Sequence, residues 1–263
     1  MRHSYEMFEV TILASGSSGN ATLVRSEGAT VLVDAGLSAK KLRERLALCG
    51  VTPEEISGIL ITHEHGDHVK GLDQWCKHYS TPLYCNRHTA TVLRDKIKEH
   101  RLWKIFETGS SFLIGSLDVR SFSIPHDAVD PVGFVLREKK YSFGFATDLG
   151  YASSLVLDAL HNVDGLLLEA NYDEELLQQD TKRPWAVKQR IASRHGHLSN
   201  HAAAALLKYL LHQELRYVAL GHLSADCNRE ELALAAIHSI IDDSSSLQRW
   251  CARPDTISQT IRL

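Results

Sequence analysis

The chain has 263 residues, 44% of them hydrophobic, with a formal net charge of −3 and a pI near 6.6. This composition is sufficient for a sizeable core, and it excludes a protein that coats nucleic acid through a global positive charge. We see no linker, low-complexity run or repeat, so we expect a single domain over residues 1–263.

The cysteines do not form a pattern typical of disulfides or thiolate zinc sites. There are five, which is an odd number, and no two are spaced as C-x-x-C. This usage favours free thiols in a reducing compartment. The sequence also shows no secretory signal and no apolar run of membrane-spanning length. We therefore expect a cytoplasmic protein without a membrane partner, and we leave a homo-oligomer open.

The N-terminal part has the pattern of short strands around a small-residue loop. Residues 8–13, 21–25 and 30–34 are typical of strands in a hairpin or meander, and residues 14–20 read ASGSSGN. Backbone N–H groups and hydroxyls in such a loop could hold a phosphate, which makes substrate-binding candidates of Ser15, Ser17, Ser18 and Asn20. A flexible turn explains the same composition, and both interpretations stay open.

Asp34 ends the third of these strands. A carboxylate there is a candidate partner for the second N–H of a metal-bound imidazole. The alternative is an Asp that caps a helix predicted over residues 38–48.

Residues 59–68 read ILITHEHGDH, a short apolar strand followed by a loop rich in metal ligands. Side chains alternate along extended backbone, so His63 and His65 point the same way and can share one divalent ion. Gly66 lets the chain turn, which offers Asp67 and His68 to a second position, while Glu64 points away. A solvated loop or a set of core histidines is the alternative. A helical H-E-x-x-H zinc motif is excluded by the spacing.

Further strands end in residues of the same chemistry. Helices are expected over residues 69–79 and 89–100, followed by short strands over 112–114, 117–124, 133–136 and 141–147. Apolar runs end at His126, Asp148, Glu169 and His222. Because several strands end in histidine or carboxylate, we expect one rim of a sheet to carry a metal centre.

Two later segments have features suited to phosphate. Residues 196–200 (GHLSN) precede a helix predicted over 202–215, and His197 there could meet an anion, or could cap or pack the helix. Residues 181–194 carry five cations, among them Lys188 and Arg190, with an aromatic residue and no acid. This composition suits backbone phosphates and base stacking, but also an ordinary solvated helix face. Residues 229–263 predict a helix and a polar tail that ends in a strand over 256–262.

These ligand-bearing strand ends resemble the ordered motifs of the metallo-β-lactamase superfamily over roughly residues 8–225. The resemblance implies an α/β fold, a four-layer αββα sandwich, with two divalent ions (Zn, Mn or Fe) at the rim. By resemblance, His63, His65 and His126 hold one metal, Asp67, His68 and His222 hold the other, and Asp148 bridges both. Asp148 stands where hydrolytic β-lactamases typically carry cysteine, which disfavours an antibiotic-degrading activity.

The finer resemblance is to the YycJ/WalJ branch, which is associated with 5′-to-3′ exonuclease action on DNA. It covers residues 14–20, 126–133, 168–171 and 196–200, and it implies substrate contacts for Asn171 and Ser199. The segment at His197 also looks like the Gly-His motif that ribonuclease Z places near its scissile phosphate. Unlike the larger nucleases, the chain has only residues 149–221 between Asp148 and His222, too few for an inserted clamping domain.

The function expected from this resemblance is DNA hydrolysis by a two-metal phosphodiesterase, in which a metal-bridging hydroxide oriented by Asp67 attacks the phosphodiester. His197, supported by Glu169, would stabilise the phosphate or protonate the leaving oxygen. One alternative is a small-molecule metallo-hydrolase acting on a cyclic phosphodiester, thioester or lactone. Another is a regulatory protein without activity, which would require an empty or blocked centre.

Overall fold

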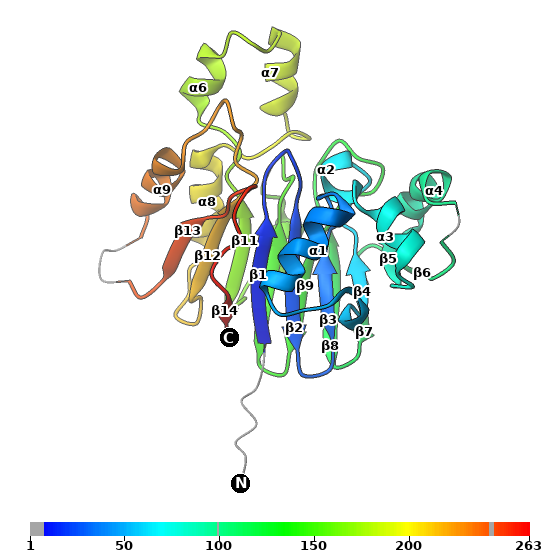
Figure 1. Cartoon of the computed structure of the whole chain (residues 1–263). Helices are drawn as coiled ribbons and strands as arrows, with labels where there is room; N and C mark the ends of the chain where they lie inside the picture. The colour runs from blue at the N-terminus through cyan, green and yellow to red at the C-terminus, as the bar shows by residue number, and fades with distance from the viewer. Residues whose placement is uncertain (1–7, 99, 242–244) are drawn as a thin grey trace.

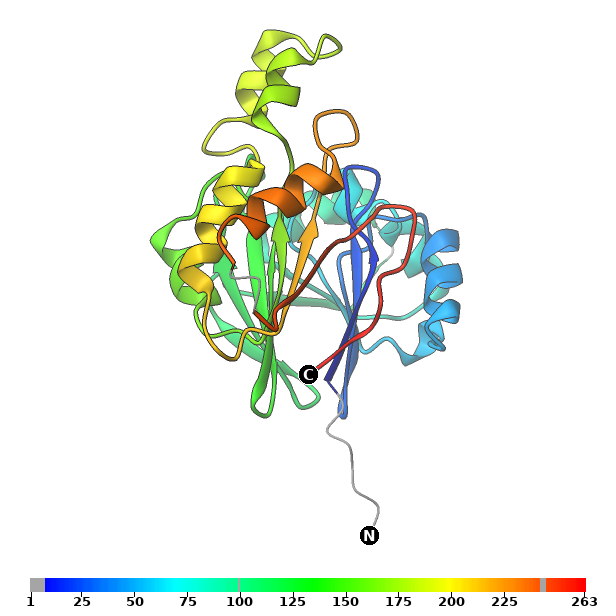
Figure 2. The ribbon, with the colours of Figure 1, turned by 90° about the vertical axis from the view of Figure 1, so that its left-hand side faces the viewer.

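The computed structural model describes residues 8–98, 100–241 and 245–263. Two seven-stranded sheets face one another, with helices on both outer faces (Figures 1 and 2). The expected four-layer αββα sandwich is therefore confirmed.

The first sheet has the order β14-β1-β2-β3-β4-β5-β6. Its strands are β1 (Phe8–Ala14), β2 (Ala21–Ser26), β3 (Thr30–Val33), β4 (Gly58–Leu60), β5 (Leu83–Asn86), β6 (Trp103–Phe106) and β14 (Ile261–Arg262). β1, β2 and β3 pair antiparallel, whereas β3 to β6 pair in parallel. The carboxyl ends of β1, β3 and β4 therefore lie on the same rim.

The second sheet has the order β13-β12-β11-β10-β9-β8-β7. Its strands are β7 (Ser111–Ile114), β8 (Leu117–Ser123), β9 (Val132–Glu138), β10 (Tyr141–Ala146), β11 (Gly165–Glu169), β12 (Tyr217–Gly221) and β13 (Gln248–Cys251). β10 to β13 are parallel, and β9 runs antiparallel between β8 and β10. The carboxyl ends of β8, β10, β11 and β12 thus share one rim as well.

Three hydrophobic clusters hold the layers together. The central one packs residues of both sheets, such as Val10, Leu60, Phe134 and Phe143, between them. The outer clusters pack helices onto the outer face of each sheet. Because many strands are covered on both faces, they read as nearly continuous apolar runs.

The helices divide between the two outer faces, except for one pair. Four helices accompany the first sheet: α1 (Ala39–Leu48), α2 (Gly66–Val69), α3 (Leu72–His78) and α4 (Arg87–Lys96). A 3₁₀ turn, Pro53–Glu55, lies between α1 and α2 in the chain. α5 (Ser154–Leu160), α8 (Asn200–Leu210) and α9 (Glu230–His238) accompany the second. The pair α6 (Glu174–Gln179) and α7 (Trp185–Ile191) rises above the rim (Figures 1 and 2).

Several expected boundaries are corrected. The helix expected over 69–79 is replaced by α3, and the residues before it form the short helix α2, which begins at Gly66. The helix expected over 89–100 is α4, which begins at Arg87 because the side chain of Asn86 accepts a hydrogen bond from Thr89 N. Residue 99 of the expected helix lies outside the described residues. The helix expected over 202–215 is α8, which Ser199 caps at its start and which ends at Leu210.

The C-terminal part agrees with its prediction in outline. α9 is the expected helix, but the strand expected over 256–262 is only β14, Ile261–Arg262. Residues 242–244 of the predicted tail, and residues 1–7 of the predicted domain, lie outside the described residues. In the part of the chain that is described, no helix combines the length and apolarity needed to cross a bilayer.

Candidate metal centre

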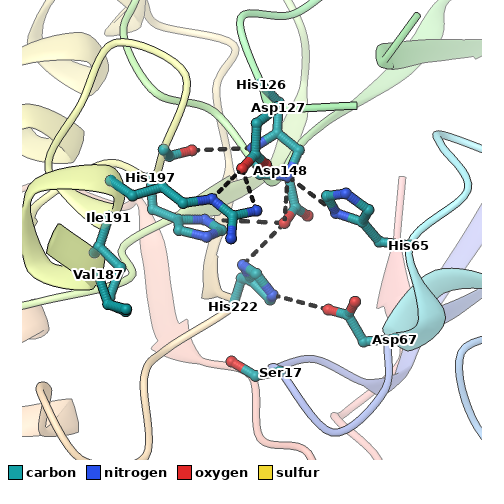
Figure 3. A pocket seen from close by; sticks show the side chains of 12 residues that line it. Ser17, His65, Asp67, His126, Asp127, Asp148, Val187, Ile191, His197 and His222 are labelled. Atoms are coloured by element: carbon teal, nitrogen blue, oxygen red, sulfur yellow. Dashed lines mark hydrogen bonds and ion pairs between the residues drawn. The ribbon is translucent and has the colours of Figure 1, made fainter. Parts of the chain in front are cut away.

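The loops at the carboxyl ends of β4, β8, β10 and β12 bring histidines and carboxylates into one pocket of ≈ 250 Å³. Figure 3 shows its lining side chains, among them His65, Asp67, His126, Asp148, His197 and His222. The expected rim centre is thus present as a geometric arrangement.

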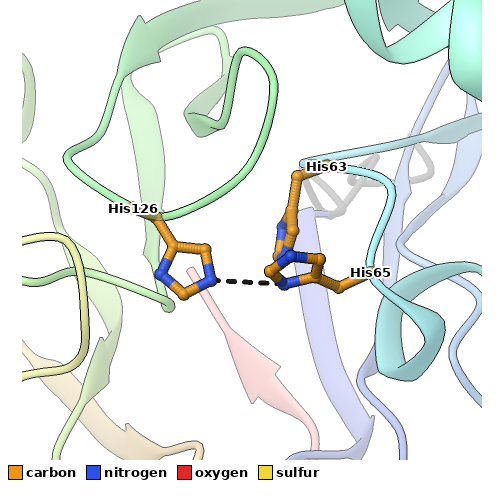
Figure 4. A group of neighbouring side chains, drawn as sticks. All are labelled: His63, His65 and His126. Carbon is orange, nitrogen blue, oxygen red and sulfur yellow. Dashed lines mark hydrogen bonds between the residues drawn. The ribbon is translucent and has the colours of Figure 1, made fainter. Parts of the chain in front are cut away.

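One group of possible ligands consists of three histidines. His63 and His65 follow β4, and His126 follows β8 on the opposite sheet. Their ring centroids lie 4.6 Å (His63–His65) and 5.1 Å (His65–His126) apart, and the three rings face one another in Figure 4. One nitrogen from each lies within 4.8 Å of the others, which is the spacing of residues that can share one ion.

A second group consists of Asp67, His68, Asp148 and His222, whose ligand atoms meet the same 4.8 Å limit. His222 Nε2 lies 3.3 Å from Asp67 Oδ2, and His68 Nε2 lies 3.1 Å from Asp148 Oδ2. Asp148 also lies 3.7 Å from His126 Nε2 of the first group. Asp148 is therefore placed between the two groups.

Each of four imidazoles is oriented by a partner on its Nδ1 atom. His68 Nδ1 lies 2.7 Å from Asp34 Oδ2, and His222 Nδ1 lies 2.8 Å from Glu169 Oε1. His63 Nδ1 lies 3.0 Å from Thr62 Oγ1, and His126 Nδ1 lies 3.1 Å from Gly196 O. An Nδ1–H that donates to these oxygens leaves the Nε2 lone pair of each ring for a metal.

Asp34 also fixes Thr62, a residue that the sequence analysis did not single out. The Asp34 carboxylate accepts from the backbone N–H of Thr62 at 2.9 Å and from its hydroxyl at 2.9 Å. Asp34 is 3% exposed and so cannot contact substrate. The structure thus places it as an orienting residue and not as a cap of α1, which Ser38 caps.

Two buried atoms at the centre are poorly satisfied. Within the described residues, His63 Nε2 has no hydrogen-bond partner, and Asp148 Oδ2 has only the ion-pair contact with His68 Nε2 at 3.1 Å. Unpaired buried polar atoms are costly, and a coordinated cation would satisfy both. The donor set of imidazole nitrogens and carboxylate oxygens also suits Zn, Mn or Fe, so the residues present fit divalent metal ions.

Burial and neighbouring charges shift the pKa values of these buried groups in different directions. Burial and the neighbouring His68 hold the pKa of His63 well below its usual value, so His63 stays neutral with a free lone pair. Burial alone would raise the pKa of Asp148, but His222 and His68 lower it well below its usual value. Burial would likewise lower the pKa of His222, which Asp148 and its hydrogen bonds instead raise to about 10.

Three residues of the centre have left-handed backbone conformations. The φ angles of Asp34, Asp148 and His222 are 62°, 59° and 55°. Each residue follows the end of a strand, and such a conformation costs about 1 kcal/mol for a residue with a Cβ atom. The sharp turn directs each side chain toward the centre, which is the common reason for strain at functional sites.

Glu169 is fully buried and links the second group to His197. Its Oε1 atom lies 2.8 Å from His222 Nδ1 and 2.9 Å from His197 Nδ1, and its Oε2 atom accepts from Leu149 N and Leu198 N. Burial would raise its pKa, but His197 and His222 lower it to about 2. His197 is partly exposed and lines the pocket, so its side chain can reach a bound molecule.

The small-residue loop mostly supports ligands instead of lining the pocket. Ser15 Oγ accepts from His222 N at 2.8 Å, and Asn20 Nδ2 lies 3.3 Å from Asp67 Oδ2 and 3.1 Å from His68 Nε2. Both residues are buried, so we assign them to positioning instead of substrate contact. Ser17 is exposed and lines the pocket, and Ser18 is exposed and lines the adjacent hollow.

The side chains of Asn171 and Ser199 also form hydrogen bonds within the protein. The amide of Asn171 donates to the His222 carbonyl at 2.6 Å. Ser199 caps α8 and donates to Glu174 Oε1 at 2.9 Å. Both side chains are buried, so their hydrogen bonds hold the loops of the centre and leave little for substrate.

Three of the five cations in the stretch 181–194 form ion pairs with acids. Lys182 and Arg183 form ion pairs with Asp226, and Lys188 Nζ donates to the Gln178 carbonyl at 2.7 Å. Arg194 stacks on Tyr151. Part of the positive charge of the stretch is therefore neutralised by Asp226, Asp180 and Asp127, and phosphate binding by the stretch stays a prediction.

Arg190 differs from the other four cations of the stretch because it lines the pocket. It forms an ion pair with Asp127, the neighbour of His126, and so connects α7 to the centre. Figure 3 shows Val187 and Ile191 of α7 on the same side of the pocket. The sequence gives no signal for this pair, since Asp127 and Arg190 lie 63 positions apart.

Comparison with known proteins agrees with this geometry. A family described as "Beta-lactamase superfamily domain" matches residues 29–218. An exodeoxyribonuclease WalJ of Streptococcus pneumoniae is 39% identical over 86% of this chain and 85% of its own. An exodeoxyribonuclease YycJ of Bacillus anthracis is 32% identical over 89% of each chain. The structure of a metallo-beta-lactamase fold protein, YhfI of Bacillus subtilis, superposes with a TM-score of 0.73 at 14% identity, covering 96% of this chain and 99% of that chain.

Proposed function

This chain belongs to the metallo-β-lactamase superfamily, in the branch of the WalJ and YycJ exodeoxyribonucleases, and we propose that it is a metal-dependent phosphodiesterase that degrades DNA from an end. The observation that carries the proposal is the pair of adjacent ligand groups at the rim, with Asp148 between them and His197 beside them.

We assign two divalent ions to these groups. His63, His65 and His126 would hold one ion, Asp67, His68 and His222 would hold the other, and Asp148 would contact both. Two such ions, when bound, activate water and stabilise the charge on the attacking and leaving oxygens of an in-line displacement at phosphorus. Zn, Mn and Fe all suit this donor set.

The protein's own groups orient the reactants. Hydrogen bonds from His222 and His68 outweigh the effect of burial and hold the pKa of Asp67 well below its usual value, so its carboxylate stays ionised and accepts a hydrogen bond from the attacking water. His197 faces the pocket and is held by Glu169, which raises its pKa although burial opposes this. His197 thus carries a proton that it can donate to the leaving oxygen of the DNA.

The choice of DNA as substrate is supported by the exodeoxyribonuclease activity for which the WalJ and YycJ relatives are named. The choice of the 5′ end rests on the resemblance to that branch. Arg190 at the pocket adds a cation for a phosphate of the strand.

A small-molecule hydrolase is the second candidate, because the pocket at the centre is only ≈ 250 Å³ and is bounded by the Arg190–Asp127 pair. A cyclic phosphodiester would fit such a volume. The discriminating experiment compares kcat/KM for bis-p-nitrophenyl phosphate with that for a linear oligonucleotide. A much higher value for the oligonucleotide supports the nuclease, and hydrolysis of the diester alone supports the second candidate.

A further inference from the structure

We propose that a trough leading from the metal centre across α2, α3 and α4 binds the sugar–phosphate backbone of a DNA strand. This inference rests on the proposed function and gives it a path for the substrate. The trough lies on the Asp67 and Ser17 side of the pocket, opposite Val187 and Ile191 of α7 (Figure 3).

The trough is continuous with the centre. Ser17 and Asp67 line both the central pocket and a neighbouring hollow of ≈ 520 Å³. That hollow shares Asp73, Lys96 and Ile97 with a third, outer hollow. A chain molecule whose reacting phosphate lies at the centre can therefore extend along one uninterrupted depression.

Three lysines of the trough, Lys70, Lys96 and Lys98, have no ion-pair partner among the described residues. Lys70 and Lys96 line the middle hollow and are exposed, and across the described residues neither has an acid within ion-pair distance. Lys98 is exposed at the outer hollow, and it too has no acid within ion-pair distance among the described residues. These lysines contrast with Lys182 and Arg183, whose charges are already neutralised by Asp226. Unpaired lysines are the groups that gain most from a phosphate.

The remaining lining also suits a nucleic-acid strand. The hydroxyls of Ser17 and Ser18 are exposed donors. Val69, Leu93 and Ile97 provide an apolar floor, which fits sugars and bases better than a simple inorganic anion. Of the two acids, Asp67 belongs to the metal centre, and Asp73 is neutralised by Lys77 at 2.6 Å.

The test is a charge reversal of the two free lysines, Lys70→Glu with Lys96→Glu, in a His65→Ala background that prevents turnover. The affinity for a fluorescein-labelled single-stranded 12-mer is measured by anisotropy over a range of salt concentrations. We expect the affinity at low salt to fall at least about tenfold, and the slope of log K against log salt to fall by about 1.4, the value for two lost phosphate contacts.

The matched control is Lys208→Glu, because Lys208 is also an exposed lysine in the last turn of a helix, α8, and lines none of these hollows. An unchanged affinity in the double variant, or an equal loss in Lys208→Glu, overturns the proposal. Equal binding of polyglutamate, with an equal loss in the double variant, would assign the trough to an acidic peptide and also overturn it.

The same lysine changes in the otherwise wild-type protein separate this inference from the proposed function. We expect KM for the oligonucleotide to rise while hydrolysis of bis-p-nitrophenyl phosphate stays unchanged. If the wild-type protein degrades no DNA, the proposed function fails. The anisotropy measurement in the His65→Ala background still shows whether the trough binds DNA. If hydrolysis of the small diester falls together with binding, the lysines act on the centre itself and the trough is wrong.

Discussion

Glu169 Oε1 lies 2.8 Å from His222 Nδ1 and 2.9 Å from His197 Nδ1, so one buried carboxylate oxygen orients two imidazoles. His222 belongs to the second ligand group, and His197 lies at the pocket surface. A single residue thereby couples the position of a metal ligand to that of the proposed proton donor.

Replacing Glu169 with Gln should impair both metal binding and turnover. The change removes the negative charge and replaces one accepting oxygen with an NH₂ donor. That donor would face either the N–H groups of Leu149 and Leu198, which are also donors, or the two imidazoles. We expect metal affinity and turnover to fall by about 10–100-fold. Metal content by mass spectrometry and steady-state kinetics measure this. Glu138→Gln is the control, because Glu138 is also buried but pairs with Ser116 at the far end of β9, and an equal effect there would contradict the account.

Replacing His197 with Ala should separate catalysis from metal binding. Since His197 is placed as a proton donor, turnover should fall by about 10²–10⁴-fold while metal content stays that of the wild type. His197 is also close enough to Asp148, Glu169 and His222 to serve as a ligand. Loss of one equivalent of metal in the variant would therefore show that His197 is a ligand and not a proton donor.

Asp34→Asn tests the orientation of His68. Asparagine tolerates the left-handed backbone at φ 62°, so the substitution removes the charge without adding strain. The weakened contacts to His68 and Thr62 should lower the free energy of unfolding by about 1–3 kcal/mol and weaken metal binding by about 10–100-fold. Chemical denaturation and metal titration measure the two effects. Unchanged metal affinity would indicate that His68 does not depend on Asp34.

Gly36→Ala should disrupt the centre without touching a ligand side chain. A Cβ atom at position 36 would lie 1.6 Å from the Asp67 carbonyl oxygen and 2.7 Å from Asn20 N, so the loops must separate. We expect lower metal content and a loss of at least about 1–3 kcal/mol of stability. Gly50→Ala is the matched control, because its added Cβ atom would meet nothing within 4 Å, although its φ of 71° adds some backbone strain. An effect no larger at Gly36 than at Gly50 would refute this packing argument.

The buried thiols predict a stability that declines at alkaline pH. Burial raises the pKa of Cys85 to about 12, from an ordinary value of 9.0. The folded state therefore keeps a proton that the unfolded state loses, so this contribution is complete below pH 9 and is lost as the pH rises toward 12. By pH 10 the loss of folding free energy from this group should amount to about 1.4 kcal/mol. Denaturation at several pH values measures it, and Cys85→Ala should reduce the slope; an identical slope would contradict the assignment.

Much of the centre could be predicted from the sequence because strands have a direction. His63, His126, Asp148 and His222 each follow an apolar run, and the carboxyl ends of these strands meet at one rim. Alternation along extended backbone also predicted that His63 and His65 point the same way. The centre could be predicted because each ligand lies in a local pattern, and the fold brings these patterns together.

Other features depended on contacts that local patterns do not encode. The stretch 181–194 looked basic because Asp226 and Asp127, which pair with its cations, lie elsewhere in the sequence. Asn171 looked available to substrate, but its amide is used by the His222 carbonyl. The trough arises where Lys70 after α2 meets Lys96 at the end of α4, and neither lysine stands in a motif.

The central claim, that this centre degrades DNA from its 5′ end, is tested most directly with a 5′-phosphorylated, 3′-labelled duplex incubated with metal-loaded protein in Mn²⁺ or Zn²⁺. His65→Ala serves as the inactive control, because His65 belongs to the first ligand group. We predict progressive release of nucleotides from the 5′ end by the wild-type protein and none by the variant. An intact duplex together with hydrolysis of a small diester would contradict it.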